Sequence, residues 1–222
     1  MIGEDNDRQT NKALKKPFRR TGPLDAYIYK QGTHEQNVKN IQENMMIHRD
    51  LQDNRKEKIL HIFTDGACQN NGKKNANAAW GCLLVSDDGY IILDRFSGAI
   101  PLGEPQTNQR SELTALLRGL EVAEKQISRI SDLKKIQIWS DSEYSINCAS
   151  VWGPKWKAKG WKKQGGEIQH LDLIRILVEK TMALGFKIEY KWLKGHKGGE
   201  SQYVFPWMFN HQVDALATSA LR

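Results

Sequence analysis

The chain has 222 residues, of which 39% are hydrophobic, enough for one sizeable core with an appendage rather than two full domains. Lysine and arginine outnumber aspartate and glutamate 33 to 26, so the net charge of +7 favours a polyanionic partner, either nucleic acid or an anionic membrane surface. The odd number of cysteines, without metal-ligand spacing, excludes a disulfide framework and predicts reduced thiols. Without a signal peptide, a transit peptide or a bilayer-spanning apolar run, we expect an intracellular protein, nuclear or cytoplasmic and not secreted.

The first part of the chain, residues 1–58, is polar, carries charges of both signs and has few aliphatic residues. This composition predicts an extension that is disordered or loosely helical, and apolar spacing within 38–51 fits one face of a short helix. The basic cluster KKPFRR at 15–20 has three interpretations: a solvated tail, a nonspecific attraction for phosphates, or a weak import signal.

A denser pattern predicts one domain over residues 59–222. Three short runs separated by turn signals predict a meander of strands: ILHIFT, AAWGCLLVS and YIILDRFS. Apolar residues at helical spacing over 113–127 predict a long helix, for which Thr107 or Asn108 offers the capping oxygen. A strand KIQIWS, a short helix from about Ser142, a basic loop, a helix LDLIRILVEK, a strand FKIEYKW and a final helix NHQVDALATSAL follow. This order predicts an α/β sheet layered with helices.

Two aspartates directly follow apolar strands, in the sequences IFTDG and IWSDS. Because active sites of open α/β sheets gather at the carboxyl ends of strands, we expect Asp65 and Asp141 to share one edge of the sheet. Glu112 near the start of the long helix and Asp214 within the last helix add two carboxylates. Four converging carboxylates repel one another unless divalent cations neutralise them, and oxygen ligands suit Mg²⁺ or Mn²⁺. Two such ions can support phosphodiester hydrolysis.

Each of these carboxylates also has an ordinary structural interpretation. Asp65 before Gly66 is typical of a turn, Asp141 before Ser142 is typical of a helix cap, and acidic residues on helices are usually solvated. Spacing alone therefore leaves the structural interpretation and the metal site both open.

The residues around the acids are more specific than the acids themselves. TDGACQNNG, TNQRSEL, SDSEY, GHKGG and NHQVDALA occur in this order and resemble the type 1 ribonucleases H, which cut the RNA strand of RNA/DNA hybrids. The resemblance covers about residues 59–222 and implies that family's fold, an α/β domain whose mixed five-stranded sheet combines three antiparallel strands with parallel strands and is flanked by helices. It further implies an endonuclease with two Mg²⁺ ions, or Mn²⁺, that leaves 5′-phosphate and 3′-hydroxyl ends. The implied partner is an RNA/DNA hybrid and no membrane, and we expect a monomer.

The resemblance also assigns the catalytic residues. Asp65, Glu112, Asp141 and Asp214 correspond to the family's metal-binding acids. His196, in a glycine-rich loop, corresponds to its mobile histidine, which is thought to assist proton transfer or product release.

Recognition of the RNA strand rests in this family on contacts to consecutive 2′-hydroxyls, the group that separates RNA from DNA. The matching positions are Cys68, chiefly through its backbone, Asn71, Asn108 and Gln109. Buried polar satisfaction or helix capping is the alternative interpretation for the two asparagines.

The segment VWGPKWKAKGWKK, residues 151–163, has five lysines, three tryptophans and no acid. Its lysines can bind phosphates while the indoles lie against sugars or bases. Its glycines and proline predict a protruding loop rather than a buried helix. A solvated lysine face with tryptophans in the core is the alternative. The position resembles the family's basic protrusion, which grips the DNA strand. The resemblance therefore implies that the DNA strand is bound here by Trp152, Lys155, Trp156, Lys159, Trp161 and Lys162, and that Thr107 belongs to the family's DNA phosphate pocket.

Three features depart from the family's pattern. Pro105 stands where some members have arginine and His170 where asparagine is common, which leaves open the strength of the DNA phosphate pocket. Residues 197–209 are longer than usual, and we expect their apolar YVFPWMF run to pack on the core rather than to contact a partner or substrate. Residues 1–58 do not resemble the hybrid-binding domain at the front of many eukaryotic members.

Two rival functions are considered against hybrid cleavage. Another nuclease or a DNA-cleaving transposase could share the sheet, but the positions that read 2′-hydroxyls argue against a DNA duplex as substrate. A non-catalytic hybrid-binding module of a replication or reverse-transcription complex is the other alternative. A pure binder gains little from four mutually repelling acids, so their presence favours the enzyme.

Overall fold

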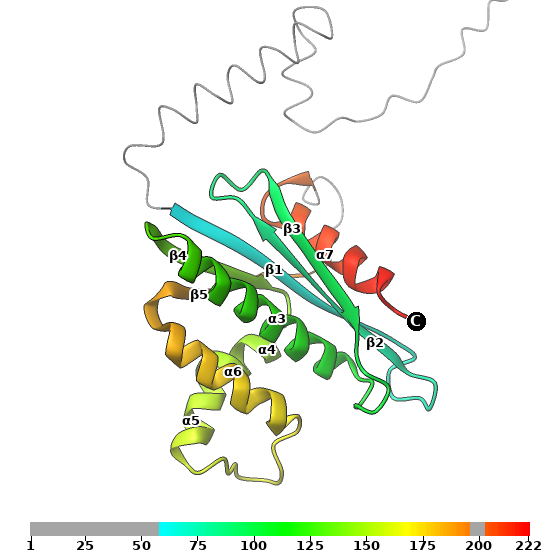
Figure 1. The fold of residues 1–222 in the computed structure, drawn as a ribbon. Helices are drawn as coiled ribbons and strands as arrows, with labels where there is room; N and C mark the ends of the chain where they lie inside the picture. Colours follow the sequence, from blue (N-terminus) through cyan, green and yellow to red (C-terminus); the bar gives the residue numbers. More distant parts are fainter. Residues whose placement is uncertain (1–57, 196–202) are drawn as a thin grey trace, which may run out of the picture. The chain divides into compact units, whose positions relative to one another are not determined.

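The computed structural model describes residues 58–195 and 203–222 (Figure 1). Predictions for residues 1–57 and for His196 fall outside the described residues. The described part contains a five-stranded sheet with the order β3-β2-β1-β4-β5. Its strands are β1 (Lys58–Gln69), β2 (Asn77–Val85), β3 (Ile92–Ala99), β4 (Leu133–Ser140) and β5 (Ile188–Trp192).

The strand pairing is mixed, as predicted. β1 pairs antiparallel with β2, and β2 pairs antiparallel with β3, which confirms the meander of the first three strands. β4 lies parallel to β1 on its other side, and β5 lies parallel to β4 at the edge. The carboxyl ends of β1, β4 and β5 therefore point the same way, which is the arrangement that collects side chains at one end of the sheet.

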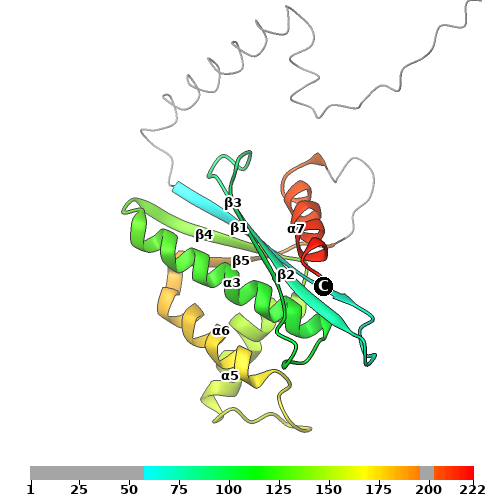
Figure 2. The same ribbon diagram turned by 45° about the vertical axis from the view of Figure 1, so that its right-hand side comes forward.

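Helices cover both faces of this sheet (Figure 2). α3 and α6 lie on one face and α7 lies on the other in both views. The helical segments are α3 (Asn108–Arg129), α4 (Glu143–Asn147), a π-helical turn (Cys148–Trp152), α5 (Gly153–Ala158), α6 (Leu171–Leu184), a 3₁₀ turn (Gly185–Lys187) and α7 (Trp207–Ser219). None of the helices in the described ranges is both long and apolar enough to cross a membrane.

Alternation along β1 divides the core into two clusters. Leu60 and Ile62 belong to the cluster on the α3 and α6 side, whereas Phe63 belongs to the smaller cluster on the α7 side. Successive side chains of a strand point to opposite faces, so one buried strand can serve both clusters. Phe209 of α7 is buried in the smaller cluster and Phe205 packs against it, although Tyr203 and Val204 are exposed. The predicted packing of the YVFPWMF run is thus confirmed for its phenylalanines.

Helix α3 begins where the sequence predicts. The side-chain oxygen of Thr107 accepts a hydrogen bond from the backbone N–H of Arg110, at 3.2 Å, and caps the first turn. This bond satisfies one of the donors that every helix start leaves unpaired. The cap fixes the position from which Glu112 leaves the helix, five residues further along the chain.

The basic segment 151–163 is mostly helical, so the prediction of a loop was wrong for its first half. It continues the π-helical turn into α5, and the chain turns only after Ala158. Pro154 lies in the first turn of α5, where a missing N–H costs nothing, so proline there is compatible with a helix. Trp156 and Trp161 pack against the larger core cluster, and this contact holds the short helix in place.

Candidate active site

Asp65 lies inside a strand rather than at its end. We expected the first strand to stop before Asp65, but β1 continues to Gln69 because its antiparallel pairing with β2 continues, with Asp65 opposite Gly81. The prediction that Asp65 ends its strand was therefore wrong. What ends near Asp65 is the parallel ladder with β4, whose last pair is Phe63 and Trp139.

Asp65 and Asp141 are nevertheless neighbours. Each lies two residues beyond the Phe63–Trp139 pair, whose rings stack 8° from parallel with their centroids 5.8 Å apart. Asp141 follows the last residue of β4 directly. Because both aspartates have the same offset from one register pair, the parallel strands bring their carboxylates together.

Glu112 reaches the same place from helix α3 because Gly66 has no side chain. A Cβ atom at Gly66 would lie 2.4 Å from the backbone nitrogen of Glu112 and 2.6 Å from the Ser111 hydroxyl oxygen. Any larger residue would therefore push the start of α3 away from β1. The glycine after Asp65 is explained by this close approach and not by a turn.

The three carboxylates form a tight group. Single oxygen atoms of Asp65, Glu112 and Asp141 all lie within 4.8 Å of one another. Asp65 is 5% exposed and Glu112 8% exposed, while Asp141 is partly buried. The Oε2 atom of Glu112 is buried and has no hydrogen-bond partner within the described part of the chain. We call these three residues the carboxylate cluster.

Burial and mutual repulsion make the carboxylate cluster weakly acidic. Burial, together with the negative charges of Asp141 and Asp214, raises the pKa of Asp65 to about 8. Burial also raises the pKa of Glu112 well above its usual range, and the charge of Asp65 adds to this shift. These shifts mean that a nearby positive charge would stabilise the ionised cluster.

Helix α7 contributes Asp214 and an amide to the edge of the carboxylate cluster. The charge of Asp214 acts on Asp65, although its carboxylate lies outside the 4.8 Å group. One turn earlier, the Nδ2 atom of Asn210 donates to Oδ2 of Asp141 at 3.4 Å. All four predicted acids thus meet at one site, three of them tightly and Asp214 beside them.

Three of the four predicted RNA-strand residues, Cys68, Asn71 and Asn108, contact one another. The Oδ1 atom of Asn71 accepts from the backbone N–H of Asn108 at 3.2 Å, and from the Cys68 thiol at 3.7 Å. The capping interpretation is therefore correct for the Oδ1 atom of Asn71, which accepts a hydrogen bond from the first residue of α3. Asn71, Asn108 and Gln109 are exposed, as residues that contact a substrate must be, and Cys68 is partly buried.

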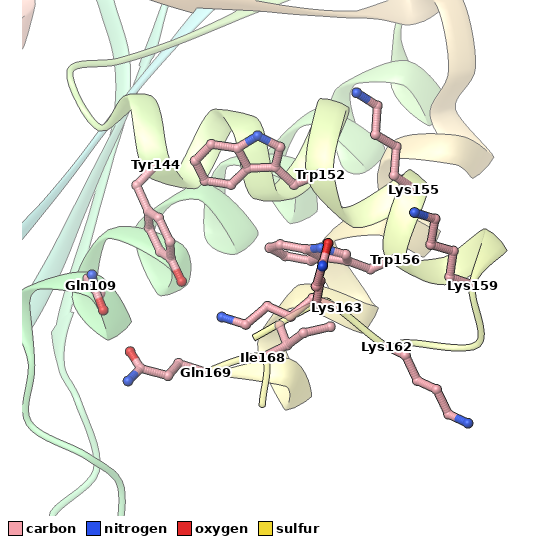
Figure 3. A pocket seen from close by; sticks show the side chains of 11 residues that line it. Gln109, Tyr144, Trp152, Lys155, Trp156, Lys159, Lys162, Lys163, Ile168 and Gln169 are labelled. Atoms are coloured by element: carbon pink, nitrogen blue, oxygen red, sulfur yellow. The ribbon is translucent and has the colours of Figure 1, made fainter. Parts of the chain in front are cut away.

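Five of the seven predicted DNA-strand residues line a hollow of about 460 Å³ (Figure 3), whereas Thr107 and Trp161 do not. The rings of Tyr144, Trp152 and Trp156 follow one another along it, each neighbouring pair having centroids 6.1 Å apart. Figure 3 shows the Lys163 side chain extending towards Tyr144, while Lys162 points outward. Trp152 is 38% exposed, so it is available for contact, whereas Trp156 is partly buried. We call this site the lysine–tryptophan hollow; it is lined by Gln109, Tyr144, Trp152, Lys155, Trp156, Lys159, Lys162, Lys163, Gln164, Ile168 and Gln169.

Thr107 lies beside a separate polar network around the start of α3. Arg110 is buried there and forms ion pairs with Glu104 at 2.6 Å and Asp172 at 2.7 Å. His170 lies close to this network at the start of α6, and burial together with the Arg110 charge lowers its pKa. A neutral histidine there offers a phosphate less attraction than a charged side chain.

Comparison with known proteins agrees with this geometry. The RNase H family model matches residues 56–222. The chain belongs to the ribonuclease H family. It is 30% identical over 161 residues to Ribonuclease H of Acidithiobacillus ferrooxidans (strain ATCC 53993), covering 72% of this chain and 85% of the relative. It is 32% identical over 164 residues to Ribonuclease H of Verminephrobacter eiseniae, covering 73% of this chain and 96% of the relative. Membership of the ribonuclease H family makes the protein a nuclease and a hydrolase.

Solved structures of the ribonuclease H family share the fold. LC9-RNase H1, a type 1 RNase H with the type 2 active-site motif, superposes with a TM-score of 0.56 at 22% identity, covering 75% of this chain and 74% of that one. The PFV RNase H domain superposes with a TM-score of 0.57 at 20% identity, covering 74% and 93%. These matches agree with the five-stranded sheet order described above.

Sequence reasoning missed several residues around the two sites. Tyr144 lines the lysine–tryptophan hollow. Its position three residues after Asp141, on the helix capped by Ser142, could have indicated that it lies near the site. Trp192, Gly195 and Asn210 surround Asp141 but lie 51 to 69 residues away in the chain. No local pattern marks such contacts, because they depend on how β5 and α7 are placed.

Proposed function

We propose that this protein is a metal-dependent endonuclease that hydrolyses the RNA strand of RNA/DNA hybrids, leaving 5′-phosphate and 3′-hydroxyl ends. The observation that supports this most strongly is the meeting of Asp65, Glu112 and Asp141 within 4.8 Å, in a chain of the ribonuclease H family. We assign this activity to residues 59–222, with residues 1–58 as an extension. A monomeric state and an intracellular location stay predictions.

The carboxylate cluster fits divalent cations. Two of its three acids are buried, the pKa of Asp65 is raised to about 8, and Oε2 of Glu112 is buried without a hydrogen-bond partner among the described residues. Oxygen donors of this kind suit Mg²⁺, and Mn²⁺ is the alternative. We infer two ions, held by Asp65, Glu112 and Asp141 with Asp214 beside them. When bound, such ions lower the pKa of a water and neutralise charge on the phosphodiester.

The chain's own residues position the reacting groups. Asp65 is fixed on its strand by a hydrogen bond from the N–H of Gly66 to its Oδ1, at 2.7 Å. Glu112 leaves a capped helix, so its carboxylate is held from a second element, and we propose that it also contacts an RNA 2′-hydroxyl. His196 lies outside the described residues, and we propose that it assists proton transfer or product release.

The two strands of the hybrid would be held on different surfaces. We propose that Cys68, Asn71, Asn108 and Gln109 read RNA 2′-hydroxyls, which a DNA strand lacks. Gln109 also lines the lysine–tryptophan hollow, so the two surfaces meet at the start of α3. The lysines of that hollow would neutralise phosphates of the DNA strand while Trp152 lies against its sugars or bases.

The test is cleavage by the purified full chain of end-labelled RNA/DNA hybrid, RNA duplex and DNA duplex, each with Mg²⁺ and with a chelator. We expect only the RNA strand of the hybrid to be cut, and only with metal. The variant Asp141→Asn should abolish cutting, since it removes one metal-binding charge at nearly constant volume. The matched control is Asp94→Asn, which changes an exposed acid on β3 and should cut at the wild-type rate.

Two results would contradict the proposal. Near wild-type cutting by Asp141→Asn would show that the carboxylate cluster is not the reaction centre. Tight binding of the hybrid without cutting at any divalent metal would identify the protein as a hybrid-binding module.

A further inference from the structure

A half-exposed tryptophan contacts the carboxylate cluster from outside. Trp192 is the last residue of β5 and is 52% exposed. Its indole N–H donates to the backbone carbonyl of Asp141, with 3.1 Å between Nε1 and the oxygen. An indole that keeps half of its surface in water gains little from burial, so this hydrogen bond is the clearest contribution of the side chain.

The bond acts where the strand ladder stops. The last register pair between β4 and β5 joins Ser140 to Trp192, and the N–H of Leu193 donates to the Ser140 carbonyl at 3.0 Å. The next carbonyl, that of Asp141, accepts instead from the N–H of Glu143 at 3.1 Å and from the Trp192 indole. Two donors from different directions use both lone pairs of this oxygen and fix the orientation of the peptide plane. That orientation fixes the backbone from which the Asp141 side chain extends.

The chain beyond Trp192 then passes close to the Asp141 carboxylate. A Cβ atom at Gly195 would lie 2.3 Å from Oδ2 of Asp141, so only glycine permits this approach. Asn210 of α7 contacts the same oxygen at 3.4 Å. Asp141 is thus supported from the β5 and α7 side, while Asp65 and Glu112 lie within 4.8 Å of it.

We propose that Trp192 is a positioning residue for Asp141: its indole N–H holds the Asp141 backbone so that the carboxylate presents the geometry that a divalent cation needs, without itself contacting metal or substrate. This inference rests on the proposed function, in which Asp141 is a metal ligand. Outer contacts that orient metal ligands contribute about ten- to a hundredfold to metal affinity in other proteins. Because Trp192 acts on the backbone rather than on the carboxylate itself, we expect the lower end of that range.

The test compares Trp192→Phe with Tyr190→Phe in the full chain. The first variant removes the N–H and keeps an aromatic ring at the end of β5. The second removes a hydroxyl from the same strand, which makes a 2.6 Å hydrogen bond to Thr181 away from the carboxylate cluster. Binding of Mn²⁺ to the substrate-free protein is measured by calorimetry, together with the melting temperature and with kcat and KM for the hybrid over a range of Mg²⁺ concentrations.

For Trp192→Phe we expect the Kd for Mn²⁺ to rise about tenfold. The Mg²⁺ concentration at half-maximal kcat should rise by a similar factor, with KM for the hybrid unchanged at saturating Mg²⁺. Tyr190→Phe should lower the melting temperature and leave both metal readouts at the wild-type value. Replacement of Trp192 by β-(3-benzothienyl)alanine, which keeps the ring shape and exchanges N–H for sulfur, should reproduce the metal effect without altering packing.

Several outcomes would overturn this inference. Unchanged Mn²⁺ affinity in both Trp192 replacements would show that the N–H does not position the ligand. A raised KM for the hybrid with unchanged Mn²⁺ affinity would make Trp192 a substrate contact. If the wild-type chain neither binds Mn²⁺ nor cuts the hybrid, the proposed function fails as well, whereas wild-type activity with unaffected Trp192 variants overturns only the positioning role.

Discussion

The carboxylate cluster places like charges in the interior, with Asp65 and Glu112 5% and 8% exposed, whereas the lysine–tryptophan hollow presents its lysines to solvent from a short helix and a turn. Buried like charges lower the free energy of unfolding unless a counter-charge is bound, while exposed lysines cost little. On the proposed function, catalysis would depend on buried charges that are unfavourable without a metal, and substrate binding on exposed charges that cost little. Changes at the carboxylate cluster should affect rate and stability in opposite directions, and changes at the hollow should affect affinity alone.

The largest expected effect is on the rate, at Glu112. Glu112→Gln keeps the side-chain volume and removes one charge, so kcat at saturating hybrid should fall by about a thousandfold or more. Single-turnover cleavage with Mg²⁺ measures this, with Glu124→Gln on the exposed face of the same helix as the control. A decrease below tenfold would remove Glu112 from the reaction centre.

The second effect is on affinity, at the lysine–tryptophan hollow. Lys155→Gln combined with Lys159→Gln should weaken hybrid binding about tenfold and reduce the slope of log affinity against log salt by about 0.9 for each phosphate that a lysine no longer neutralises. The control pair, Lys125→Gln with Lys134→Gln, changes the net charge equally at two exposed lysines away from the hollow. Equal decreases in affinity for both pairs would mean that net charge, and not this hollow, attracts the hybrid.

The third effect is on stability, at Asp65. Its folded-state pKa of about 8 exceeds the unfolded value of 3.8, so the metal-free protein loses stability as pH rises from about 4 to 8. Asp65→Asn should therefore raise the melting temperature at pH 8 in chelator, by about 5 °C, and by less at pH 5. Adding Mg²⁺ should stabilise the wild type more than this variant. A less stable variant at pH 8 without metal would contradict the account of repelling charges.

The smallest effect concerns His61, whose ring packs against Trp139 and Phe205. Its Nδ1 accepts from the Trp139 indole at 3.3 Å, and burial lowers its pKa despite the nearby acids Asp87 and Asp88. Because the unfolded chain takes up this proton at a higher pH, the folded state loses stability as pH falls below about 6.5. The difference in melting temperature between wild type and His61→Gln should grow by about 2 °C from pH 5 to 7. A constant difference would show that His61 does not titrate in this way.

The sequence predicted features that local chemistry fixes. Thr107 caps α3 because its hydroxyl needs only the backbone three residues later. At α4 the capping residue is Ser142, and not Asp141 as the capping interpretation of that aspartate had it. The meander of β1 to β3 was readable because apolar runs alternate with turn residues. The short sequence motifs around the four acids were specific enough to indicate the ribonuclease H family, which the family match confirms.

The misreadings came from contacts over long distances in the chain. β1 continues past Asp65 because β2 continues to pair with β1. No sequence pattern near Asp65 predicts that pairing. The lysine segment forms α5 because Trp156 packs against the larger core cluster, and this packing outweighs the weak helix propensity of Gly153.

By itself, the sequence determined the order of the elements, the capped start of α3 and the identity of the four acids, because each depends on residues a few positions apart. Only the tertiary structure decided that Gly66 lets α3 reach β1, that the Phe63–Trp139 register aligns Asp65 with Asp141, and that Trp192 supports Asp141. These are distances between atoms far apart in the chain, and they exist only once strands and helices have packed.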